Sequence, residues 1–381
     1  MILDGQSTDV AIVGGGIIGL AAAYFLASSG KGRVPAVMVL EAGTIGGQAS
    51  GRNAGTLSLQ NKPPLLTSTC LLGYEQWRQL ESSLPGGVGW MPKGGLCVAQ
   101  TEAEEESLAE RYRIRREGGL PLSWLDRRDL AVHHPWLSSS VRAASYNPLD
   151  AQANPLLVVF RLRAAAKERG VRVVQHRAVI SAEPLDGGWL LATRQGRIRA
   201  ETVIVAAGGW ADTVGSLFGC QIPMERKVPQ LAITERLPFL LPLVLVTENN
   251  RLSMKQYPSG QAMIGGGWQG YPLEPEYRRT NLCLASVAGN AALMADIVPA
   301  LKSTRVLRLW SCMEGMSPDR LPYLGPYDGK PGLFFAVEGY GGFTLGLAFA
   351  RMVVDHLVSG RELPEWAAPD RFARLAFVKS L

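Results

Sequence analysis

Residues 10–30, VAIVGGGIIGLAAAYFLASSG, restrict what this chain can fold into more than any other segment. No charged residue occurs between residues 11 and 29, and about 20 apolar residues suffice to cross a bilayer, so a membrane span is one interpretation. The three consecutive glycines argue against it. They favour a buried parallel strand over residues 9–13, a turn at residues 14–16 and a helix over residues 17–30.

The spacing Gly14-x-Gly16-x-x-Gly19 is that of a dinucleotide-binding turn. In such a turn the first glycine reverses the chain, the second lets the backbone approach a pyrophosphate, and the third lets the helix pack on the strand. A second strand is expected over residues 36–43 and contains Glu41, at the position where an acid binds ribose hydroxyls. This β-α-β context predicts a dinucleotide site but does not separate NAD from FAD.

Other segments of the chain fit the same sheet. The stretch 43–56, GTIGGQASGRNAGT, is too long for a simple connection and offers many hydrogen-bond donors. Residues 155–170 are typical of a helix and 171–183 of a strand, and residues 187–212 predict a hairpin that leads into a buried strand. That strand is followed by Gly208 and Gly209, and small residues there would let a dinucleotide lie across the sheet edge.

A second glycine-to-helix junction lies near the C-terminus. A short strand is expected over residues 333–337, then a glycine-rich loop from Gly339 to Gly342, then a helix that begins near Thr344. Backbone amides at the start of that helix favour a negatively charged group. In a flavoenzyme this group would be the N1/C2=O edge of the ring.

Composition narrows the classes of protein to which the chain can belong. The chain has 381 residues, 47% of them hydrophobic and 19% charged, which predicts an ordinary globular protein with room for two domains. Its net charge of +6 is scattered, so nucleic-acid binding is not favoured. Five widely spaced cysteines indicate neither a disulfide framework nor a metal site. The N-terminus has no secretory signal pattern, which predicts a cytoplasmic protein with no transmembrane segment, and attachment to the periphery of the inner membrane stays open.

Together these segments resemble the FAD-dependent family of D-amino acid oxidase and glycine/sarcosine oxidase. The resemblance rests on the fingerprint with Glu41, ASGRNAG (49–55), VIVAAGGWA (203–211), SPDRLPYLG (317–325) and EGYGGFTLG (338–346). It is greatest for dehydrogenase subunits of the opine, proline or hydroxyproline, hydrogen cyanide synthase and sarcosine oxidase beta type. It implies a tightly held FAD and the two-electron oxidation of a C–N bond to an imine, which water hydrolyses.

The resemblance also implies an α/β fold with two domains. A discontinuous Rossmann-like FAD-binding domain would comprise residues 1–82, 147–215 and 305–381. A substrate-binding α+β domain with a mainly antiparallel sheet would comprise residues 83–146 and 216–304. Its charged helix, residues 101–119, is expected to be a solvated face.

The expected FAD-binding residues lie in the fingerprint, in the loop after the second strand, in the returning strands and in the last glycine-rich junction. They are Gly14, Gly16, Ile17, Ile18, Gly19, Glu41, Ala42, Ser50, Gly51, Arg52, Asn53, Ala54, Gly55, Val179, Ala207, Gly208, Trp210, Cys312, Gly339, Gly341, Gly342, Phe343 and Thr344.

Cys312 aligns with the cysteine that carries the flavin covalently in monomeric sarcosine oxidase. A covalent link there and a buried structural thiol are the two interpretations, and the second, with non-covalent FAD, is favoured because free cysteine behaves as a small hydrophobe.

Five residues are candidates for the substrate side. Glu314 stands where many members of the family place an arginine that binds the substrate carboxylate. Either Arg52 or Lys255 anchors a carboxylate instead, or the substrate presents a cation to Glu314, or Glu314 points away. By analogy with the family, Lys255, Gln256 or Tyr257 lies near the flavin, and Tyr340 borders the pocket.

The resulting function is hydride transfer from the carbon of a small-molecule amine or amino acid to FAD, with no metal. Oxygen, a quinone or a partner subunit would take the electrons, and the resemblance to subunit-type members favours the partner. A non-catalytic FAD-binding or electron-relay subunit is the main alternative, and an NAD-dependent dehydrogenase is a weaker one.

Overall fold

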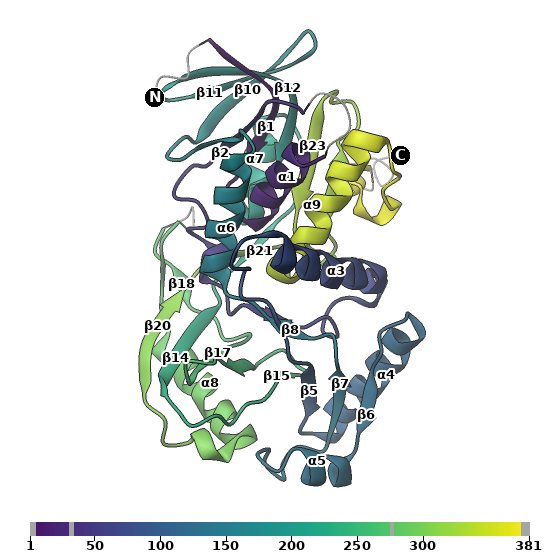
Figure 1. Cartoon of the computed structure of the whole chain (residues 1–381), viewed down its shortest axis with the longest axis vertical. Helices are drawn as coiled ribbons and strands as arrows, with labels where there is room; N and C mark the ends of the chain where they lie inside the picture. The colour runs from purple at the N-terminus through teal and green to yellow at the C-terminus, as the bar shows by residue number, and fades with distance from the viewer. Residues whose placement is uncertain (1–4, 30–33, 275–277, 375–381) are drawn as a thin grey trace. The chain divides into compact units, whose positions relative to one another are not determined.

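The computed structural model describes residues 5–29, 34–274 and 278–374 (Figure 1). The chain divides into two compact units. Unit 1 comprises residues 1–51, 156–226 and 314–381, and unit 2 comprises residues 52–155 and 227–313. The first boundary thus follows residue 51, whereas the sequence pattern places it after residue 82. The division of FAD binding and substrate binding between two domains stays a prediction.

Unit 1 contains one large sheet and the helices that cover it. Its main elements are β1 (Gln6–Val13), α1 (Ile17–Ala27), β2 (Val37–Leu40), α6 (Pro155–Glu168), β9 (Arg172–Val174), β10 (Val179–Leu185), β11 (Gly188–Thr193), β12 (Gly196–Val205), η2 (Gly208–Trp210), α7 (Ala211–Ser216), β21 (Glu314–Met316), β22 (Tyr323–Pro326), β23 (Leu333–Val337), α9 (Gly342–Ser359) and η4 (Glu365–Ala367). Two short elements, α2 (Ala49–Arg52) and β13 (Glu225–Lys227), run across the boundaries.

The sheet of unit 1 has the order β10-β11-β12-β1-β2-β9, and β23 pairs with the end of β12. β23, β12, β1, β2 and β9 pair with one another in parallel, whereas β11 is antiparallel to β12 and forms the expected antiparallel hairpin with β10. The predicted Rossmann-like half of the α/β fold is therefore confirmed. The expectation of one strand over residues 171–183 is wrong, because His176 adopts φ 56° and breaks it into β9 and β10, which lie at opposite ends of the sheet.

Both faces of the parallel strands are buried. Ala11 and Val13 pack in one cluster with Trp189 and Phe335, whereas Ile12 points to the other face, toward α1. Strands covered on both faces are continuously apolar, which explains the unbroken hydrophobic run of β1.

α1 and α9 lie against each other on that second face (Figure 1). A side chain on Gly346 of α9 would come within 3.1 Å of Ile18, so the glycine allows a close approach. By length and composition α9 alone among the described helices is apolar enough to cross a membrane, but 56% of it is buried inside the protein, as in a core helix. α1, which carries the opening apolar run, is shorter than a span requires.

Unit 2 contains a second sheet of eight strands. Its elements are β3 (Thr56–Leu57), η1 (Pro64–Leu66), α3 (Thr67–Ser83), β4 (Met91–Pro92), β5 (Gly95–Ala99), α4 (Glu102–Glu117), β6 (Ser123–Leu125), α5 (Arg127–His133), β7 (Ala143–Asn147), β8 (Ala151–Gln152), β14 (Gln230–Arg236), β15 (Val244–Thr247), β16 (Ser253–Gln256), β17 (Gln261–Gly265), β18 (Tyr271–Pro272), β19 (Thr280–Asn281), α8 (Leu284–Ile297), η3 (Pro299–Leu301) and β20 (Val306–Ser311). The order is β20-β14-β17-β16-β15-β5-β7-β6, and every neighbouring pair is antiparallel except β15 and β5. The predicted second fold, α+β with a mainly antiparallel sheet, is confirmed.

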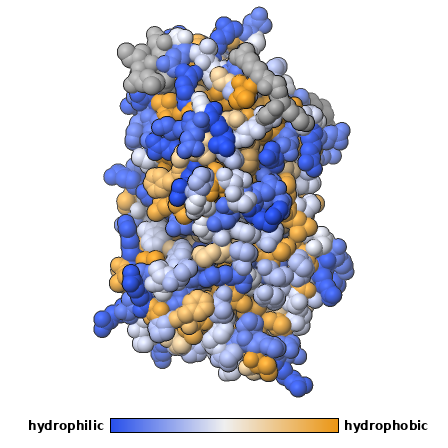
Figure 2. All heavy atoms as spheres, viewed as in Figure 1, coloured by the Kyte–Doolittle hydropathy of each residue, from blue (hydrophilic) through white to orange (hydrophobic). Residues whose placement is uncertain are grey.

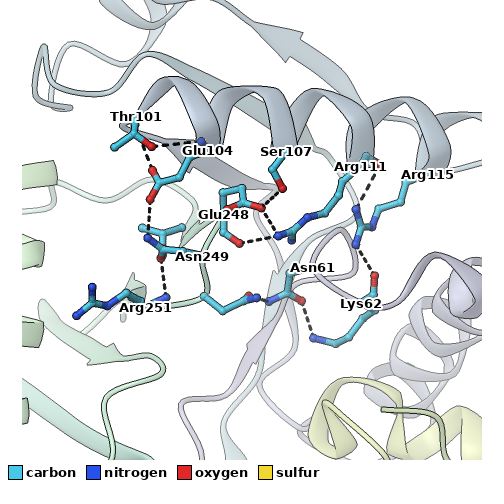
Figure 3. A network of polar contacts seen from close by, with 12 residues as sticks. Asn61, Lys62, Thr101, Glu104, Ser107, Arg111, Arg115, Glu248, Asn249 and Arg251 are labelled. Carbon is cyan, nitrogen blue, oxygen red and sulfur yellow. Dashed lines mark hydrogen bonds and ion pairs between the residues drawn. The ribbon is translucent and has the colours of Figure 1, made fainter. Parts of the chain in front are cut away.

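The charged helix α4 differs from the solvated face that was expected (Figure 3). Thr101 and Glu104 form the capping box that starts it. Further along, Ser107 donates to Glu248 over 2.7 Å and Arg111 forms an ion pair with the same carboxylate. Arg115 is only 4% exposed, and burial lowers the pKa of its guanidinium to about 10. One side of this helix is therefore a buried polar contact with the rest of unit 2.

Hydrophilic and hydrophobic side chains are interspersed on the face of the molecule that Figure 2 shows. Single large apolar side chains are exposed, among them Phe160 of α6 and Leu284 of α8. Scattered exposed residues of this kind are normal for a folded protein.

Asp150 joins the segment after β3 to β7 in unit 2. Its carboxylate is fully buried and accepts hydrogen bonds from Ser58 Oγ (2.8 Å), the Leu59 amide (2.8 Å), Gln60 Nε2 (3.0 Å) and Asn147 Nδ2 (2.6 Å). Gln60 Nε2 also donates to the carbonyl of Gly95 over 3.1 Å, but the other three donors have this carboxylate as their acceptor in a site from which water is excluded.

We expect Asp150→Ala to lower the free energy of unfolding by about 3 kcal/mol, because it leaves several buried donors unpaired. Urea denaturation of the purified protein measures the change. Asp186→Ala, in the exposed turn between β10 and β11, is the control and should change the value by less than about 0.5 kcal/mol. Equal effects of the two substitutions would contradict a stabilising role for Asp150.

Candidate functional site

The turn between β1 and α1 leaves no room for side chains. Gly14 has φ 120°, and a Cβ on it would lie 2.3 Å from the carbonyl oxygen of Ala206. A Cβ on Gly19 would lie 2.1 Å from the oxygen of Gly14. Ser50 Oγ accepts the Ile17 amide over 2.9 Å at the start of α1. The result is a tight turn lined by backbone amides, which fits the pyrophosphate of a dinucleotide.

Glu41 follows β2 and lies against this turn. One oxygen of its carboxylate accepts the Gly15 amide and the other accepts the Gly43 amide, each over 2.7 Å. Each oxygen keeps a second lone pair, so the carboxylate can still accept a ribose hydroxyl. The Arg177 amide donates to the backbone oxygen of Glu41, and Val179 begins β10 two residues later.

The carboxyl ends of β12 and β23 continue the same edge of the sheet. The Ala206 amide donates to Val13 over 2.9 Å, and Ala207 leads into η2, where Gly208 has φ 55°. Trp210 closes that short helix. The chain after β12 is therefore kept close to the glycine turn.

The last glycine-rich junction follows β23. Gly341 has φ 72° at the start of α9, and Thr344 is buried in the first turn of that helix. A Cβ on Gly339 would lie 2.1 Å from the oxygen of Leu321, so the SPDRLPYLG segment packs directly on this loop. Tyr340 is half-buried, and its ring centre is 5.8 Å from the guanidinium of Arg320.

Glu338 is a residue at this edge that the sequence reasoning missed. It is 9% exposed, and its oxygens lie near Gly208. Burial, and then the charge of Glu314 on β21, raise the pKa of its carboxyl group to about 7. The available signal was an acid inside the apolar and glycine-rich stretch FFAVEGYGG.

The expected FAD-binding residues of unit 1 thus line one sheet edge, and glycines fill the positions where a side chain would block it. The residues fit FAD. The segment 52–55 belongs to unit 2 instead. There the carbonyl of Arg52 accepts the indole of Trp310 over 2.8 Å, and Asn53 Oδ1 accepts the Gly55 amide over 2.6 Å. Ala54 lies between them, and Cys312, also in unit 2, is a cysteine whose side chain is only 1% exposed.

Lys255 of β16 is the most unusual side chain of unit 2. It is 1% exposed, and no group in the described part of the chain forms a hydrogen bond with its Nζ. Nζ lies 5.2 Å from the ring centre of Tyr257 and 2.7 Å from the point that a Cβ on Gly55 would occupy. Burial, and then the charge of Lys93, lower the pKa of this amine well below its ordinary value.

The two neighbours of Lys255 in the sequence differ from it. Gln256 Oε1 accepts the amides of Leu240 and Leu241, and its Nε2 donates to the oxygens of Pro238 and Gly260. These bonds engage both polar atoms of the side chain in holding the hairpin together. Burial raises the pKa of Tyr257 to about 12. Catalytic roles for these two residues stay predictions.

We expect Lys255→Met to stabilise the substrate-free protein at neutral pH. At pH values between its lowered pKa and 10.5, the amine is uncharged in the native state, whereas it binds a proton in the unfolded chain. The free energy of unfolding therefore falls as the pH drops through this window. The variant removes this loss. Urea unfolding should show that the variant has a higher free energy of unfolding than the wild type. The difference should be largest at the low-pH end of this window and absent near pH 10.5.

Lys167→Met, on the exposed side of α6, is the matched control and should show no such trend. A gain in stability that does not depend on pH would mean that Lys255 is not held uncharged.

Comparison with known proteins places the chain among flavoproteins. The model of the family described as "FAD dependent oxidoreductase" matches residues 9–356. Glycine oxidase of Geobacillus kaustophilus (strain HTA426) is 28% identical over 374 residues, with 96% of this chain and 97% of that protein covered. One of the subunits of opine oxidase from Rhizobium meliloti is 26% identical over 369 residues, with 93% and 94% covered. The crystal structure of L-proline dehydrogenase from P. horikoshii superposes with a TM-score of 0.87 at 23% identity and 97% and 98% coverage, which shows a common fold.

Proposed function

Because the chain belongs to the family of FAD-dependent oxidoreductases, we propose that it oxidises the C–N bond of an amino acid or a secondary amine to an imine. FAD is its cofactor, as predicted. The similarity to a glycine oxidase and to one chain of an opine oxidase supports an amine as the donor. When bound, FAD supplies the acceptor for two electrons and one hydrogen from the carbon next to nitrogen.

The observation that carries the proposal is the isolated amine of Lys255. A buried group without a hydrogen-bond partner costs folding free energy, so such groups are commonly kept for a ligand. In this proposal the ligand is the carboxylate of the substrate, which would form a charge-assisted hydrogen bond with Nζ. Gly55 has no side chain beside Nζ, and Tyr257 limits the other side with an aromatic ring.

In this proposal Lys255 also accepts a proton from the ammonium group of the substrate. An amino acid arrives as an ammonium ion, and only the neutral amine can lose a hydride from the adjacent carbon. At a pH between its lowered pKa and 10.5 Lys255 is uncharged before binding, so in that range it can accept that proton. The resulting ammonium of Lys255 then pairs with the carboxylate, so that one proton transfer leaves the amine neutral and anchors the acid. Glu314 lies in unit 1 and is not required for this step.

We expect Lys255→Met to raise the dissociation constant for an amino-acid substrate about 10- to 100-fold, the value of one charge-assisted hydrogen bond. Anaerobic bleaching of the flavin absorbance measures it, after a panel of glycine, sarcosine, proline, D-amino acids and opines has identified the substrate. The amide analogue of that substrate lacks the carboxylate, so its binding should be the same in both proteins.

Lys302→Met is the control, because Lys302 is an exposed lysine of the same unit. It should change the dissociation constant by less than about threefold. If Lys255→Met has no larger effect than this control, the anchor lies elsewhere. If no member of the panel bleaches the wild-type flavin, the chain is better explained as an electron-relay subunit.

For the electron acceptor we propose a partner chain, with oxygen or a quinone as the alternatives. The similarity to a protein named as one of the subunits of an opine oxidase supports this choice. Among the described residues no cluster of three or more histidine, cysteine or acidic side chains could hold a metal, so a metal centre that takes the electrons would lie outside this part of the chain.

We therefore expect the purified chain, once reduced, to react slowly with air. Stopped-flow absorbance after mixing with oxygen gives the rate, and a protein that copurifies with the chain should accelerate reoxidation when it is added back. Fast formation of peroxide by the chain alone would identify oxygen as the acceptor and exclude the need for a partner.

A further inference from the structure

Glu338 is a buried acid that the proposed chemistry does not use. It follows β23 directly. A Cβ on Gly208 would lie 3.4 Å from Oε1, and a Cβ on Gly342 would lie 3.1 Å from the carboxyl carbon. No cation of the described chain contributes to its electrostatic environment. The carboxyl group is thus withdrawn from water, and a hydrogen bond from its own backbone amide offsets only part of the effect of burial on its pKa.

The charged group that faces Glu338 has the same sign. Glu314 lies on β21, and β21 packs on η2, because a Cβ on Gly315 would lie 2.3 Å from Gly209. The residues of η2, Gly208–Trp210, carry no charge. In α9 the first charged residue is Arg351, more than two turns into the helix, where it pairs with Asp355. Burial and a like charge therefore both favour the protonated form of Glu338.

The order of the strands places Glu338 relative to the parts of a dinucleotide. β2, β1, β12 and β23 are neighbours in this order, and their carboxyl ends carry Glu41, the glycine turn, Gly208 and Glu338. In dinucleotide folds the acid binds the ribose next to the adenine and the glycine turn binds the pyrophosphate. An FAD that continues across this edge extends its flavin half toward β12 and β23.

We propose that the buried carboxyl group of Glu338 lies beside the flavin half of FAD, so that flavin reduction is coupled to proton uptake by this side chain. A hydride brings two electrons and one proton and leaves the reduced flavin with one negative charge. A carboxylate at position 338 would add a like charge in a poorly solvated place, whereas a carboxylic acid would not.

Electrons and protons balance as follows. At low pH the reduction consumes two electrons and one proton, because Glu338 is already protonated. Above neutral pH it consumes two electrons and two protons, one on the flavin and one on an oxygen of Glu338, with solvent as the source of the second. Glu338 thereby holds the reduction potential higher at alkaline pH than a permanent carboxylate would.

The test is the midpoint potential of the FAD-loaded full-length protein as a function of pH, with dithionite as the reductant and dyes as the reference. No substrate is present, so the result is independent of the amine chemistry proposed above. One extra proton for two electrons changes the equilibrium constant tenfold per pH unit, so the slope should steepen by about 30 mV per pH unit above neutral pH.

Two variants separate the groups involved. Glu338→Gln should give one slope at every pH and a higher potential than the wild type at alkaline pH. For Glu314→Gln, the plot of midpoint potential against pH should still contain the steeper region, but this region should begin at lower pH. The like charge that opposes ionisation of Glu338 is absent in this variant. A wild-type plot with one slope between about pH 6 and pH 9, or the same steepening in Glu338→Gln, would overturn the proposal.

If Glu338→Gln does not retain FAD, infrared difference spectra of the wild type decide the matter. Reduction above neutral pH should produce the C=O band of a newly protonated carboxylic acid. Reduction without that band would also overturn the proposal.

Discussion

The approach of backbone to backbone at the glycine turn is the constraint on which the rest of unit 1 depends. The carbonyl of Ala206 occupies the space that a side chain on Gly14 would need, and the carbonyl of Gly14 does the same at Gly19. These contacts let β1, α1 and the end of β12 meet without a gap. Gly208 and Glu338 are then placed at the same edge through the parallel pairing of β12 with β23. Substitution of any of these small residues would displace several parts of the site at once.

Each unit contains a buried ionisable group that has no counter-ion among the described residues. Lys255 in unit 2 and Glu338 in unit 1 are both shifted toward their uncharged forms by burial, and a like charge adds to the shift in each case. In ion pairs such as Arg111 with Glu248, each charge is compensated by the opposite charge of its partner. Uncompensated groups gain charge only when a ligand or a change of redox state makes the charge favourable. Perturbed ionisable groups of this kind are typical of functional sites.

Much of the fold could be predicted from the sequence because its signals are local. The glycine spacing, Glu41 and the apolar runs predicted the β-α-β unit, and the resemblance of several further motifs predicted the family and FAD, all of which are confirmed. What failed depended on distant contacts. A backbone reversal at His176 divided one expected strand into two, and Glu248, far along the chain, converts one side of α4 into a buried contact. Lys255 was named as a candidate, but its lack of a partner is visible only once the sheet is assembled. Glu338 begins the EGYGGFTLG motif but was assigned no role, because its burial is visible only in the folded chain.

The discontinuity of unit 1 has a consequence for biosynthesis. β1 and α1 leave the ribosome first, yet the strand that extends their sheet, β23, and the helix that covers α1, α9, come from residues 333–337 and 342–359. All of unit 2 is translated in between. During that interval the apolar surface of α1 has no permanent cover, and exposed apolar surface on a nascent chain is prone to aggregate. Completion of unit 1 must therefore await the synthesis of β23 and α9, and a transcript truncated before β23 would yield an aggregation-prone fragment rather than a smaller flavoprotein.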